Sequence, residues 1–455
     1  MDNSTPKRRR SAHCPQSGVL WDYPIRLDAF CRTIDPLLQA EEVAQGNVER
    51  SLNTEINQSH GHRTAYELKG VFMNHLWNRV FRGCVALFSV LEICAVSAFS
   101  ADAGEPGGIL SFSEAPAPGR GVWSAVGAME YERDWFTATT LRNGRVLVAG
   151  GYSYETYTVT DAELFDSTTR SWTETGEMHF GRYSHTATLL ANGRVLVAGG
   201  YDGDEMSSAE IYNPAVGTWS NTGSLNVARE QHAATLLQDG RVLVVGGYGD
   251  YGTIGSTELF NPATGRWTLA GNLPVPLSWT TATTLGNGLV LVAGGYTDTG
   301  GVANCELFDS STGRWSPTGR LHIGRFFHTA TLLADGRVLV AGGDDGSYGG
   351  TNTAEIYNPA TGVWSWAGNV RNARTRHTAA LLADGRVLVA GGWNGQVIPS
   401  VEIFYPASRA WSATGRLITE RDEHASAVLP NGRVLVAGGL NQNRDVLGSA
   451  EVFTP

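Results

Sequence analysis

The chain has 455 residues, of which 42% are hydrophobic and 17% are charged, and this composition is typical of a folded globular protein rather than a disordered one. Its formal net charge is −10, and residues 104–455 contain 23 arginines, 33 acidic residues and no lysine. A negatively charged region of this kind argues against non-specific nucleic-acid binding, which requires cations that neutralise phosphates.

The first part of the chain carries the only membrane-like segment. Residues 84–99, CVALFSVLEICAVSAF, form an apolar run that is shorter than the roughly 20 residues a transmembrane helix needs. Arg79 and Arg82 precede this run and small residues around Ala101 follow it, an order typical of a secretory signal. We therefore predict that translation starts at Met73 and that residues 73–103 are an export signal. The mature protein is then secreted or at the cell surface, with no stable membrane span.

Two alternatives remain open for residues 1–72. They are either the product of a wrongly assigned start codon or a poorly structured extension that precedes an internal anchor helix. Four of the five cysteines lie in the first hundred residues: Cys14, Cys31, Cys84 and Cys94. Their spacing matches neither a zinc site nor a Cys-x-x-Cys pair, so no metal is predicted there.

Beyond this region, two sequence markers repeat with the same period of 47 to 49 residues. One marker is a Gly-Gly pair, which begins at Gly150, Gly199, Gly246, Gly294, Gly342, Gly391 and Gly438. The other is a tryptophan followed four residues later by glycine, found at Trp123, Trp172, Trp219, Trp267, Trp315, Trp364 and Trp411. Because two independent markers share one period, this region is predicted to contain seven copies of one structural unit.

Each unit is predicted to form four short antiparallel strands, as residues 185–223 illustrate. A β-rich run, HTATLLA, ends at Asn192-Gly193, which supplies the positive φ angles of a two-residue hairpin turn. The apolar strand RVLVAGG follows and is typical of a strand covered on both faces. A third strand, AEIY, leads through the turn NPAVG into a fourth strand that begins at Trp219.

These units resemble Kelch repeats in the Gly-Gly pair, in the spaced tryptophan, and in an aromatic residue two places after a third-strand glutamate. That aromatic residue is Phe165, Tyr212, Phe260, Phe308, Tyr357, Phe404 and Phe453 in successive units. The resemblance covers roughly residues 119–455 and implies an all-β, seven-bladed β-propeller of four-stranded Kelch blades. Residues 104–455 are assigned to this domain.

The strand order predicts how the propeller closes. The chain enters at Trp123 with only a fourth strand and leaves at Phe453 after only a third strand. An N-terminal outer strand is therefore expected to complete the last blade, because an open ring would leave exposed strand edges that favour aggregation.

Residues present in every unit are predicted to be scaffold, because a single active site needs each catalytic group only once. The repeated tryptophans meet this criterion, as do the third-strand glutamates, whose expected partners are arginines of the blade or backbone amides. These glutamates are Glu163, Glu210, Glu258, Glu306, Glu355, Glu402 and Glu451.

An Arg-x-x-His element occurs in five units and is also interpreted as structural. Its histidines are His185, His232, His328, His377 and His424. Each starts the first strand of a different blade, so symmetry holds them too far apart to share one metal ion. They are expected to form structural hydrogen bonds, and no metal or cofactor is predicted.

The fourth unit departs from the pattern at three positions together. Leu277 replaces the arginine of the Arg-x-x-His element, Thr280 replaces its histidine, and Leu289 replaces the arginine of the Asn-Gly-Arg turn. Their joint loss suggests that the three groups form one polar network in other blades, because losing all three avoids an unpaired buried charge. Independent drift is the alternative.

Aromatic residues outside the repeat pattern define the candidate binding face. Trp135, Trp279 and Trp366 fall in or beside connections from a fourth to a first strand, and Trp393 lies in a connection from a second to a third strand. In a four-stranded meander these two kinds of connection lie on the same face. The loops of this face supply the further candidates Tyr152, Tyr154, Tyr201, Asp202, Asp204, Tyr248, Tyr251, Asp344, Asp345 and Tyr348.

Exposed aromatic rings beside carboxylates are suited to stacking on sugars or anchoring a protein. Kelch propellers of known type commonly bind partners through this face, so the resemblance favours the same function here. We therefore predict a binding module for an unidentified protein or glycan, with no catalytic residue assigned. Packing of the loops on one another is the structural alternative.

Resemblance also suggests two enzymatic alternatives. Copper radical oxidases such as galactose oxidase share the seven-bladed Kelch propeller, and they require a tyrosine crosslinked to a cysteine, a tyrosine next to a histidine, and another histidine. This chain has no Tyr-His neighbours, and Cys305 occupies a slot that is alanine in most units, as expected of a small core residue. Sugar-isomerising Kelch enzymes, which rely on arginine and glutamate, are the second alternative.

Overall fold

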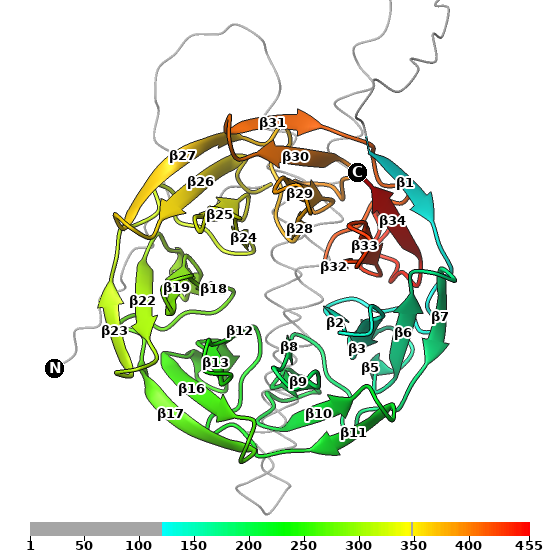
Figure 1. Cartoon of the computed structure of the whole chain (residues 1–455), viewed down its shortest axis with the longest axis horizontal. Helices are drawn as coiled ribbons and strands as arrows, with labels where there is room; N and C mark the ends of the chain where they lie inside the picture. Colours follow the sequence, from blue (N-terminus) through cyan, green and yellow to red (C-terminus); the bar gives the residue numbers. More distant parts are fainter. Residues whose placement is uncertain (1–120, 347–348) are drawn as a thin grey trace, which may run out of the picture. The chain divides into compact units, whose positions relative to one another are not determined.

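The structure, a computed structural model, describes residues 121–346 and 349–455. This part of the chain folds into seven four-stranded antiparallel sheets, the blades of a propeller, around a common axis (Figure 1). In each blade the first strand of the sheet lies nearest the axis and the fourth strand lies at the circumference. The all-β, seven-bladed architecture predicted from the repeat is therefore confirmed.

Blades 1 to 6 are each formed by strands that follow one another along the chain. Blade 1 contains β2 (Thr137–Thr140), β3 (Val146–Ala149), β6 (Ala162–Asp166) and β7 (Ser171–Glu174). Blade 2 contains β8 (Thr186–Leu189), β9 (Val195–Ala198), β10 (Ala209–Asn213) and β11 (Thr218–Asn221). Blade 3 contains β12 (Ala233–Leu236), β13 (Val242–Val245), β16 (Ser256–Asn261) and β17 (Arg266–Asn272).

The second half of the ring has the same organisation. Blade 4 contains β18 (Thr281–Thr284), β19 (Leu289–Ala293), β22 (Cys305–Asp309) and β23 (Arg314–Pro317). Blade 5 contains β24 (Thr329–Leu332), β25 (Val338–Ala341), β26 (Thr353–Asn358) and β27 (Val363–Asn369). Blade 6 contains β28 (Thr378–Leu381), β29 (Val387–Ala390), β30 (Val401–Tyr405) and β31 (Ala410–Ala413).

Short hairpins extend three connections between the second and third strands. They are β4 (Tyr152–Ser153) with β5 (Tyr157–Thr158), β14 (Tyr248–Gly249) with β15 (Gly252–Thr253), and β20 (Tyr296–Thr297) with β21 (Gly300–Gly301).

Blade 7 closes the ring by joining the two ends of the described region. It contains β32 (Ala425–Val428), β33 (Val434–Ala437) and β34 (Ala450–Thr454), with β1 (Val122–Ala125) as the outer strand. Strand β1 pairs antiparallel with β34, and Trp123 lies opposite Phe453. The predicted closure by an N-terminal outer strand is confirmed, so the edge of β34 is covered (Figure 1).

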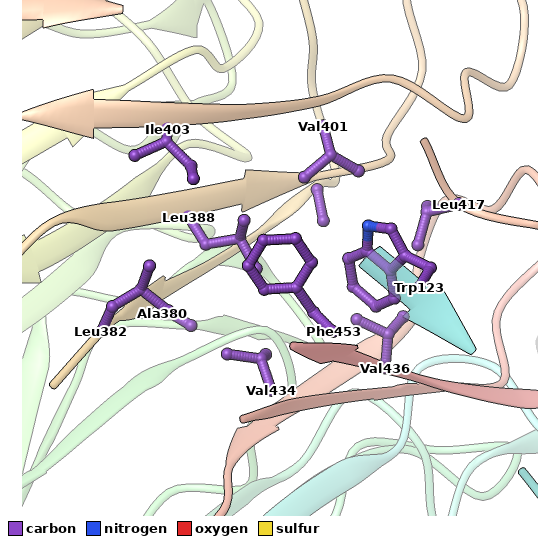
Figure 2. Packing of buried hydrophobic residues seen from close by; sticks show 11 residues of the cluster. Trp123, Ala380, Leu382, Leu388, Val401, Ile403, Leu417, Val434, Val436 and Phe453 are labelled. Carbon is purple, nitrogen blue, oxygen red and sulfur yellow. The ribbon is translucent and has the colours of Figure 1, made fainter. Parts of the chain in front are cut away.

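The hydrophobic core lies between neighbouring blades. Each apolar cluster combines residues of two adjacent sheets, and the second strands are buried on both faces, which explains their continuous Val-Leu-Val-Ala sequence. Figure 2 shows one such layer, in which Trp123 and Phe453 of blade 7 pack beside Leu388 and Ile403 of blade 6.

The tryptophan and the glycine four residues later are two sides of one contact between blades. The indole N–H of Trp219 donates a hydrogen bond of 2.7 Å to the carbonyl oxygen of Gly176, which follows the tryptophan of the preceding blade by four residues. A side chain at Gly176 would collide with the carbonyl oxygen of Gly217. The same bond from an indole N–H to a glycine carbonyl is made by Trp123, Trp172, Trp267 and Trp364, so the two residue types recur with the same spacing.

The Gly-Gly pair also serves contact between blades. In blade 2, Gly199 and Gly200 have φ angles of 64° and 106°, a region that glycine enters at little cost. The Gly200 N–H donates to the Arg229 carbonyl of blade 3 at 2.9 Å, and a side chain at Gly199 would collide with His232. These contacts fix the loops that form the site described below.

The predicted export signal at residues 73–103 and the predicted extension at residues 1–72 lie outside the described residues, as do residues 104–120 of the predicted propeller domain. In the ranges that the structure does describe, no helix is long and apolar enough to span a bilayer.

Candidate binding site at the propeller axis

The connections that carry the predicted site share one face, which we call the loop face. It is formed by the connections from a fourth to a first strand and from a second to a third strand. Isolated β-bridges join the two kinds of connection within each blade, for example Asp134 with Tyr152 and Thr375 with Trp393. The sequence-based placement of these connections on one side of the propeller is confirmed.

Seven residues, one from each blade, form a ring around the axis of the loop face. They precede the histidine position of the Arg-x-x-His element, and all have left-handed φ angles between 48° and 56°. We call them the axial ring: Trp135, Ser184, Gln231, Trp279, Phe327, Arg376 and Glu423. A residue with a side chain is strained there by roughly 1–3 kcal/mol, so the surrounding structure must hold the conformation.

Backbone hydrogen bonds between blades support the strained ring. The N–H of Gln231 donates to the carbonyl oxygen of Ser184, and the N–H of Trp279 donates to that of Gln231, both at 3.0 Å. The N–H of Glu423 donates to the carbonyl oxygen of Arg376 at 3.1 Å. The ring is thus a uniform backbone scaffold that can display different side chains at its seven positions.

The axial ring surrounds a pocket with a volume of about 290 Å³. Below the ring, the pocket is lined by residues at the histidine position and its equivalents: Phe136, His185, His232, Thr280, His328 and His424. This volume lies at the lower end of the range of small-molecule sites. It suits one ring-sized chemical group rather than an extended peptide.

Aromatic side chains from blades 1, 4 and 5 contact one another at the pocket. The rings of Trp279 and Phe327 are 4.5 Å apart between centroids, and those of Trp135 and Phe327 are 5.9 Å apart. Tyr296 and Phe326 pack behind Trp279. The buried indole N–H of Trp279 has no hydrogen-bond partner among the described residues.

Polar residues form two pairs between the aromatic ones around the ring, Arg376 with Glu423 from blades 6 and 7 and Ser184 with Gln231 from blades 2 and 3. Arg376 and Glu423 form an ion pair in which Nη1 lies 2.6 Å from Oε1. The guanidinium of Arg376 also lies over Phe327, with Cζ 4.8 Å from the ring centre. Gln231 and Ser184 supply uncharged donors and acceptors between Trp135 and Trp279.

The histidines below the ring are uncharged structural groups at neutral pH. Nε2 of His185 lies 3.0 Å from the hydroxyl of Thr137 in the preceding blade, and Nε2 of His328 lies 3.1 Å from that of Thr281. Burial lowers the pKa of each of these two histidines to about 3. They therefore join blades by hydrogen bonds, as the sequence indicated.

The arginine of the Arg-x-x-His element pairs with the third-strand glutamate of its own blade. In blade 5, Nη2 of Arg325 lies 2.8 Å from Oε1 of Glu355, and both side chains are fully buried. Glu355 also accepts the backbone N–H groups of His322 and Ile323. Arginines and backbone amides are thus the partners of this glutamate, as expected for a scaffold residue.

The expectation that the three residues lost in blade 4 form one network in other blades is wrong. The arginine of the Arg-x-x-His element binds its glutamate, and the histidine binds the preceding blade. The arginine of the Asn-Gly-Arg turn lies on the opposite face, where the equivalent Arg241 pairs with Asp239 at 2.6 Å. Three separate interactions share one spacing, because each belongs to a unit that is repeated around the ring.

Blade 4 therefore keeps a glutamate without its arginine. Leu277 occupies the place of that arginine, and Pro274 removes one of the two backbone N–H donors. Glu306 is 8% exposed, its Oε2 has no hydrogen-bond partner among the described residues, and burial raises its pKa.

The structure separates the four predicted tryptophans. Trp135 and Trp279 both belong to the axial ring and line the pocket. Trp366 lies on the outermost strand β27, is 47% exposed, and stacks on His322 with 4.6 Å between ring centres. Trp393 lies in the second connection of blade 6, where it pairs with Thr375 and Val397.

The predicted loop residues are distributed around this pocket. Tyr152 and Tyr201 both pack against Tyr183, with ring centres 5.7 Å and 5.4 Å away. Tyr248 pairs with Glu230 and Asp344 pairs with Phe326 through isolated bridges. The remaining described candidates are exposed: Tyr154, Tyr251, Asp202, Asp204 and Asp345. Tyr348 lies outside the described residues.

Sequence analysis missed five of the seven axial-ring residues, namely Ser184, Gln231, Phe327, Arg376 and Glu423. A signal for them was present. In a chain whose other positions repeat, the residue before the histidine position changes in almost every unit. A periodic position with a variable side chain is expected where a symmetric scaffold carries an asymmetric site.

Comparison with protein families identifies the repeat. The model described as the KLHDC2/KLHL20/DRC7 Kelch-repeats domain matches residues 135–318 and 231–439. The chain belongs to the Kelch-repeat family. A search of curated proteins finds no match for this Kelch chain.

Solved structures confirm the Kelch propeller fold. A fungal alcohol oxidase of the AA5 family, in complex with copper, aligns with a TM-score of 0.63 and 18% sequence identity. The alignment covers 74% of this chain and 76% of the oxidase. At this level of identity the likeness shows the fold alone.

The axial pocket does not provide the donor set expected of a copper radical oxidase. Among its described lining residues there is neither a tyrosine nor a cysteine. Cys305 is 2% exposed in the core between blades 4 and 5, where burial raises the pKa of its thiol to about 12. No group of three or more His, Cys, Asp or Glu side chains in residues 121–346 and 349–455 is arranged to hold a metal ion.

Proposed function

We propose that the protein is a secreted or cell-surface binding module that recognises a glycan through the axial pocket of its loop face. The observation that supports this most is the combination of aromatic rings and polar side chains around one ring-sized pocket. Sugar rings present apolar C–H faces, which suit aromatic stacking, and hydroxyl groups, which suit Gln231, Ser184 and the Arg376–Glu423 pair.

The charge of the pocket supports a non-acidic sugar. Arg376 is neutralised by Glu423, and the histidines below the ring are uncharged at neutral pH. An acidic sugar would bring a carboxylate that no free cation of the pocket lining balances, and burying an unpaired charge is costly. The proposal therefore disfavours uronic-acid polymers.

Binding to an array of glycans, followed by titration monitored by tryptophan fluorescence, tests this function. Trp279→Ala should weaken binding by about tenfold, because it removes a stacking surface from the pocket. Trp366→Ala is the matched control, since this tryptophan is exposed on the outer strand, and it should bind normally. Failure of the unaltered protein to bind any glycan would refute the proposal.

A protein partner is the second candidate. Three tyrosines of the loop face are exposed, namely Tyr154, Tyr157 and Tyr251, and exposed aromatic residues are enriched where proteins bind one another. Affinity capture from the organism's own culture medium, with identification of a partner that Tyr251→Ala releases, would favour this candidate over glycan binding.

The enzymatic alternatives are tested by direct assay. Copper bound in stoichiometric amount together with oxidase activity would overturn the binding proposal, and so would turnover of a sugar by isomerisation. Export is tested separately by sequencing the N-terminus of the protein recovered outside the cell, where residues close to Ala103 should come first.

A further inference from the structure

Five tyrosines of blades 1 and 2 contact one another on the loop face. We call them the tyrosine cluster: Tyr152, Tyr154, Tyr157, Tyr183 and Tyr201. The ring of Tyr152 is central. The rings of Tyr154, Tyr157 and Tyr183 lie edge-on to it, with centroids 5.6 Å, 5.8 Å and 5.7 Å away, and Tyr183 lies 5.4 Å from Tyr201. Because these contacts hold the rings in place, little side-chain freedom is left to lose when a ligand binds.

The tyrosine cluster begins beside the axial pocket. Tyr183 directly precedes Ser184 of the axial ring. Tyr152 pairs through an isolated β-bridge with Asp134, which directly precedes Trp135 of the ring. Ser184 and Trp135 both line the pocket. The tyrosine cluster is therefore continuous along the backbone with the part of the pocket wall that blades 1 and 2 supply.

The other end of the tyrosine cluster is exposed to solvent. Tyr154 is 52% exposed and Tyr157 is 69% exposed, whereas the other three rings are half-buried. Strand β5, which carries Tyr157, lies farther from the propeller axis than β2 of the same blade (Figure 1). The hydroxyl of Tyr154 donates a hydrogen bond of 3.2 Å to the carbonyl oxygen of Arg444 in blade 7. The cluster thus offers aromatic surface from the edge of the pocket to the outer part of the loop face.

Tyr157 has a backbone conformation that the equivalent hairpins give to glycine. Its φ angle is 67°, and it pairs with Ser153 across the hairpin of blade 1. The residues at this position in blades 3 and 4 are Gly252 and Gly300, with φ angles of 103° and 121°. A tyrosine is strained there, and because most of its ring is exposed, folding gains little from it. Strain that is kept at an exposed position favours a role in binding.

The charge of the loop face favours a ligand without negative charge. The connections between second and third strands contain ten acidic residues and one arginine, in residues 150–161, 199–208, 246–255, 294–304, 342–352, 391–400 and 438–449. The connections of the opposite face contain nine arginines and three aspartates. Because charge is segregated along the propeller axis, the electric field repels anions from the loop face. Arg376 in the pocket is already paired with Glu423.

From this arrangement we infer that the ligand is an uncharged oligosaccharide of at least three sugar units. One unit occupies the axial pocket, and the following units stack on the tyrosine cluster of blades 1 and 2. The steps of 5.7 Å and 5.8 Å from Tyr183 through Tyr152 to Tyr157 extend beyond the one ring-sized unit that the pocket holds. A tyrosine offers an apolar face to sugar C–H groups and a hydroxyl to sugar oxygens. This inference rests on the proposed glycan-binding function and adds the length and charge of the glycan.

Length series of uncharged oligosaccharides test the inference on the full-length chain. Cello-, laminari-, xylo-, manno- and N-acetylated chito-oligosaccharides of one to six units are titrated by calorimetry, together with the length series of any other neutral glycan that the array identifies. In the series that binds most tightly, the trimer should bind about tenfold more tightly than the monosaccharide, because further units stack on the tyrosines. Trigalacturonic acid, an acidic trimer, should bind at least about tenfold more weakly than this neutral trimer.

Tyr157→Gly is the most informative variant. It gives blade 1 the residue that blades 3 and 4 have in their hairpins and relieves the strained φ angle, so the variant should unfold cooperatively like the unaltered protein. It should bind the monosaccharide normally and reduce the advantage of the trimer about fivefold. Tyr405→Asn is the matched control, because it removes a tyrosine from the opposite face and introduces the asparagine that blades 2, 3 and 5 have at this position. It should keep the full length dependence.

Each outcome separates the two proposals. A monosaccharide that binds as tightly as its trimer overturns the inference and leaves glycan binding standing, and so does a length dependence that Tyr157→Gly leaves intact. Tighter binding of trigalacturonic acid than of every neutral trimer also overturns the inference. Binding of no saccharide in the series or on the array, by a protein that unfolds cooperatively, overturns both proposals. A protein partner that Tyr157→Gly releases would then account for the tyrosine cluster.

Discussion

The unpaired glutamate of blade 4 offers a test of what the buried ion pairs contribute to stability. We compare Glu306→Gln with Glu355→Gln, the same substitution at the equivalent position of blade 5. Glu355 is fully buried and lies 2.8 Å from Arg325, which is also fully buried. Removing its charge leaves the Arg325 guanidinium without an anion, so we expect a loss of about 3 kcal/mol in the free energy of unfolding.

Glu306 should respond in the opposite direction. Leu277 stands where the arginine would be, so no buried cation loses a partner, and glutamine removes a carboxylate that is poorly solvated. We expect Glu306→Gln to be neutral or to stabilise the protein by about 1 kcal/mol at neutral pH. Urea denaturation followed by tryptophan fluorescence measures both variants under the same conditions.

The pH dependence follows from the direction of the pKa shift. Burial raises the pKa of Glu306 in the folded protein, so the ionised side chain destabilises the fold above that pKa and the protonated side chain does not. The advantage of Glu306→Gln should therefore be present at neutral pH and shrink as the pH falls through the raised pKa. A loss at Glu306 as large as that at Glu355 would refute the reasoning, because it would mean that Glu306 has a strong partner.

Three further outcomes follow from closure and burial. Deleting residues 104–128 removes β1, exposes the edge of β34, and should lower the melting temperature of the whole propeller. Trp123→Ala should cost about 3–5 kcal/mol, whereas the exposed Trp366→Ala should cost less than about 1 kcal/mol. Burial lowers the pKa of His328 in the folded protein to about 3. The contribution of the neutral histidine to the free energy of unfolding is therefore fully present above the pKa that His328 has in the unfolded chain, and it is lost as the pH falls below that value.

The controls for these outcomes come from the repeat itself. His328→Thr reproduces the residue found at Thr280 in blade 4 and should flatten part of the acid-dependent loss of stability, measured as the melting temperature between about pH 7 and pH 5. An unchanged pH profile in this variant would show that the histidine does not control acid stability. An unchanged melting temperature after deletion of residues 104–128 would contradict the closure of blade 7.

Much of the fold could be predicted because the decisive interactions are repeated in every blade. The Trp219 indole bonds the Gly176 carbonyl, and the same pair of residues recurs in the sequence wherever this junction recurs in space. Turn glycines and continuous apolar strands are local features, so each unit indicates its own four strands. The partial units at Trp123 and Phe453 then determined closure by simple strand order.

The candidate site could be predicted only in part. Trp135 and Trp279 were found because tryptophan is unusual at their position, and Trp366 was included although it lies on the outer strand. Phe327, Arg376 and Glu423 were missed because candidates were chosen from residues outside the repeat pattern. These three residues occupy a repeated position at which the side chain varies. The prediction of one network among the polar residues that Leu277, Thr280 and Leu289 replace was wrong, because equal spacing along the chain does not imply contact.

The amino-acid sequence by itself determined the strands, the number of blades and the residues that join one blade to the next, because these depend on interactions within a unit or between neighbours. Only the tertiary structure decided which side chains meet at the axis. Closure of the ring brings together seven residues separated by whole repeats, Trp135 and Glu423 among them. It also gathers the acidic connections on one face and the arginine-rich turns on the other, since the strand meander sends alternate connections to opposite ends.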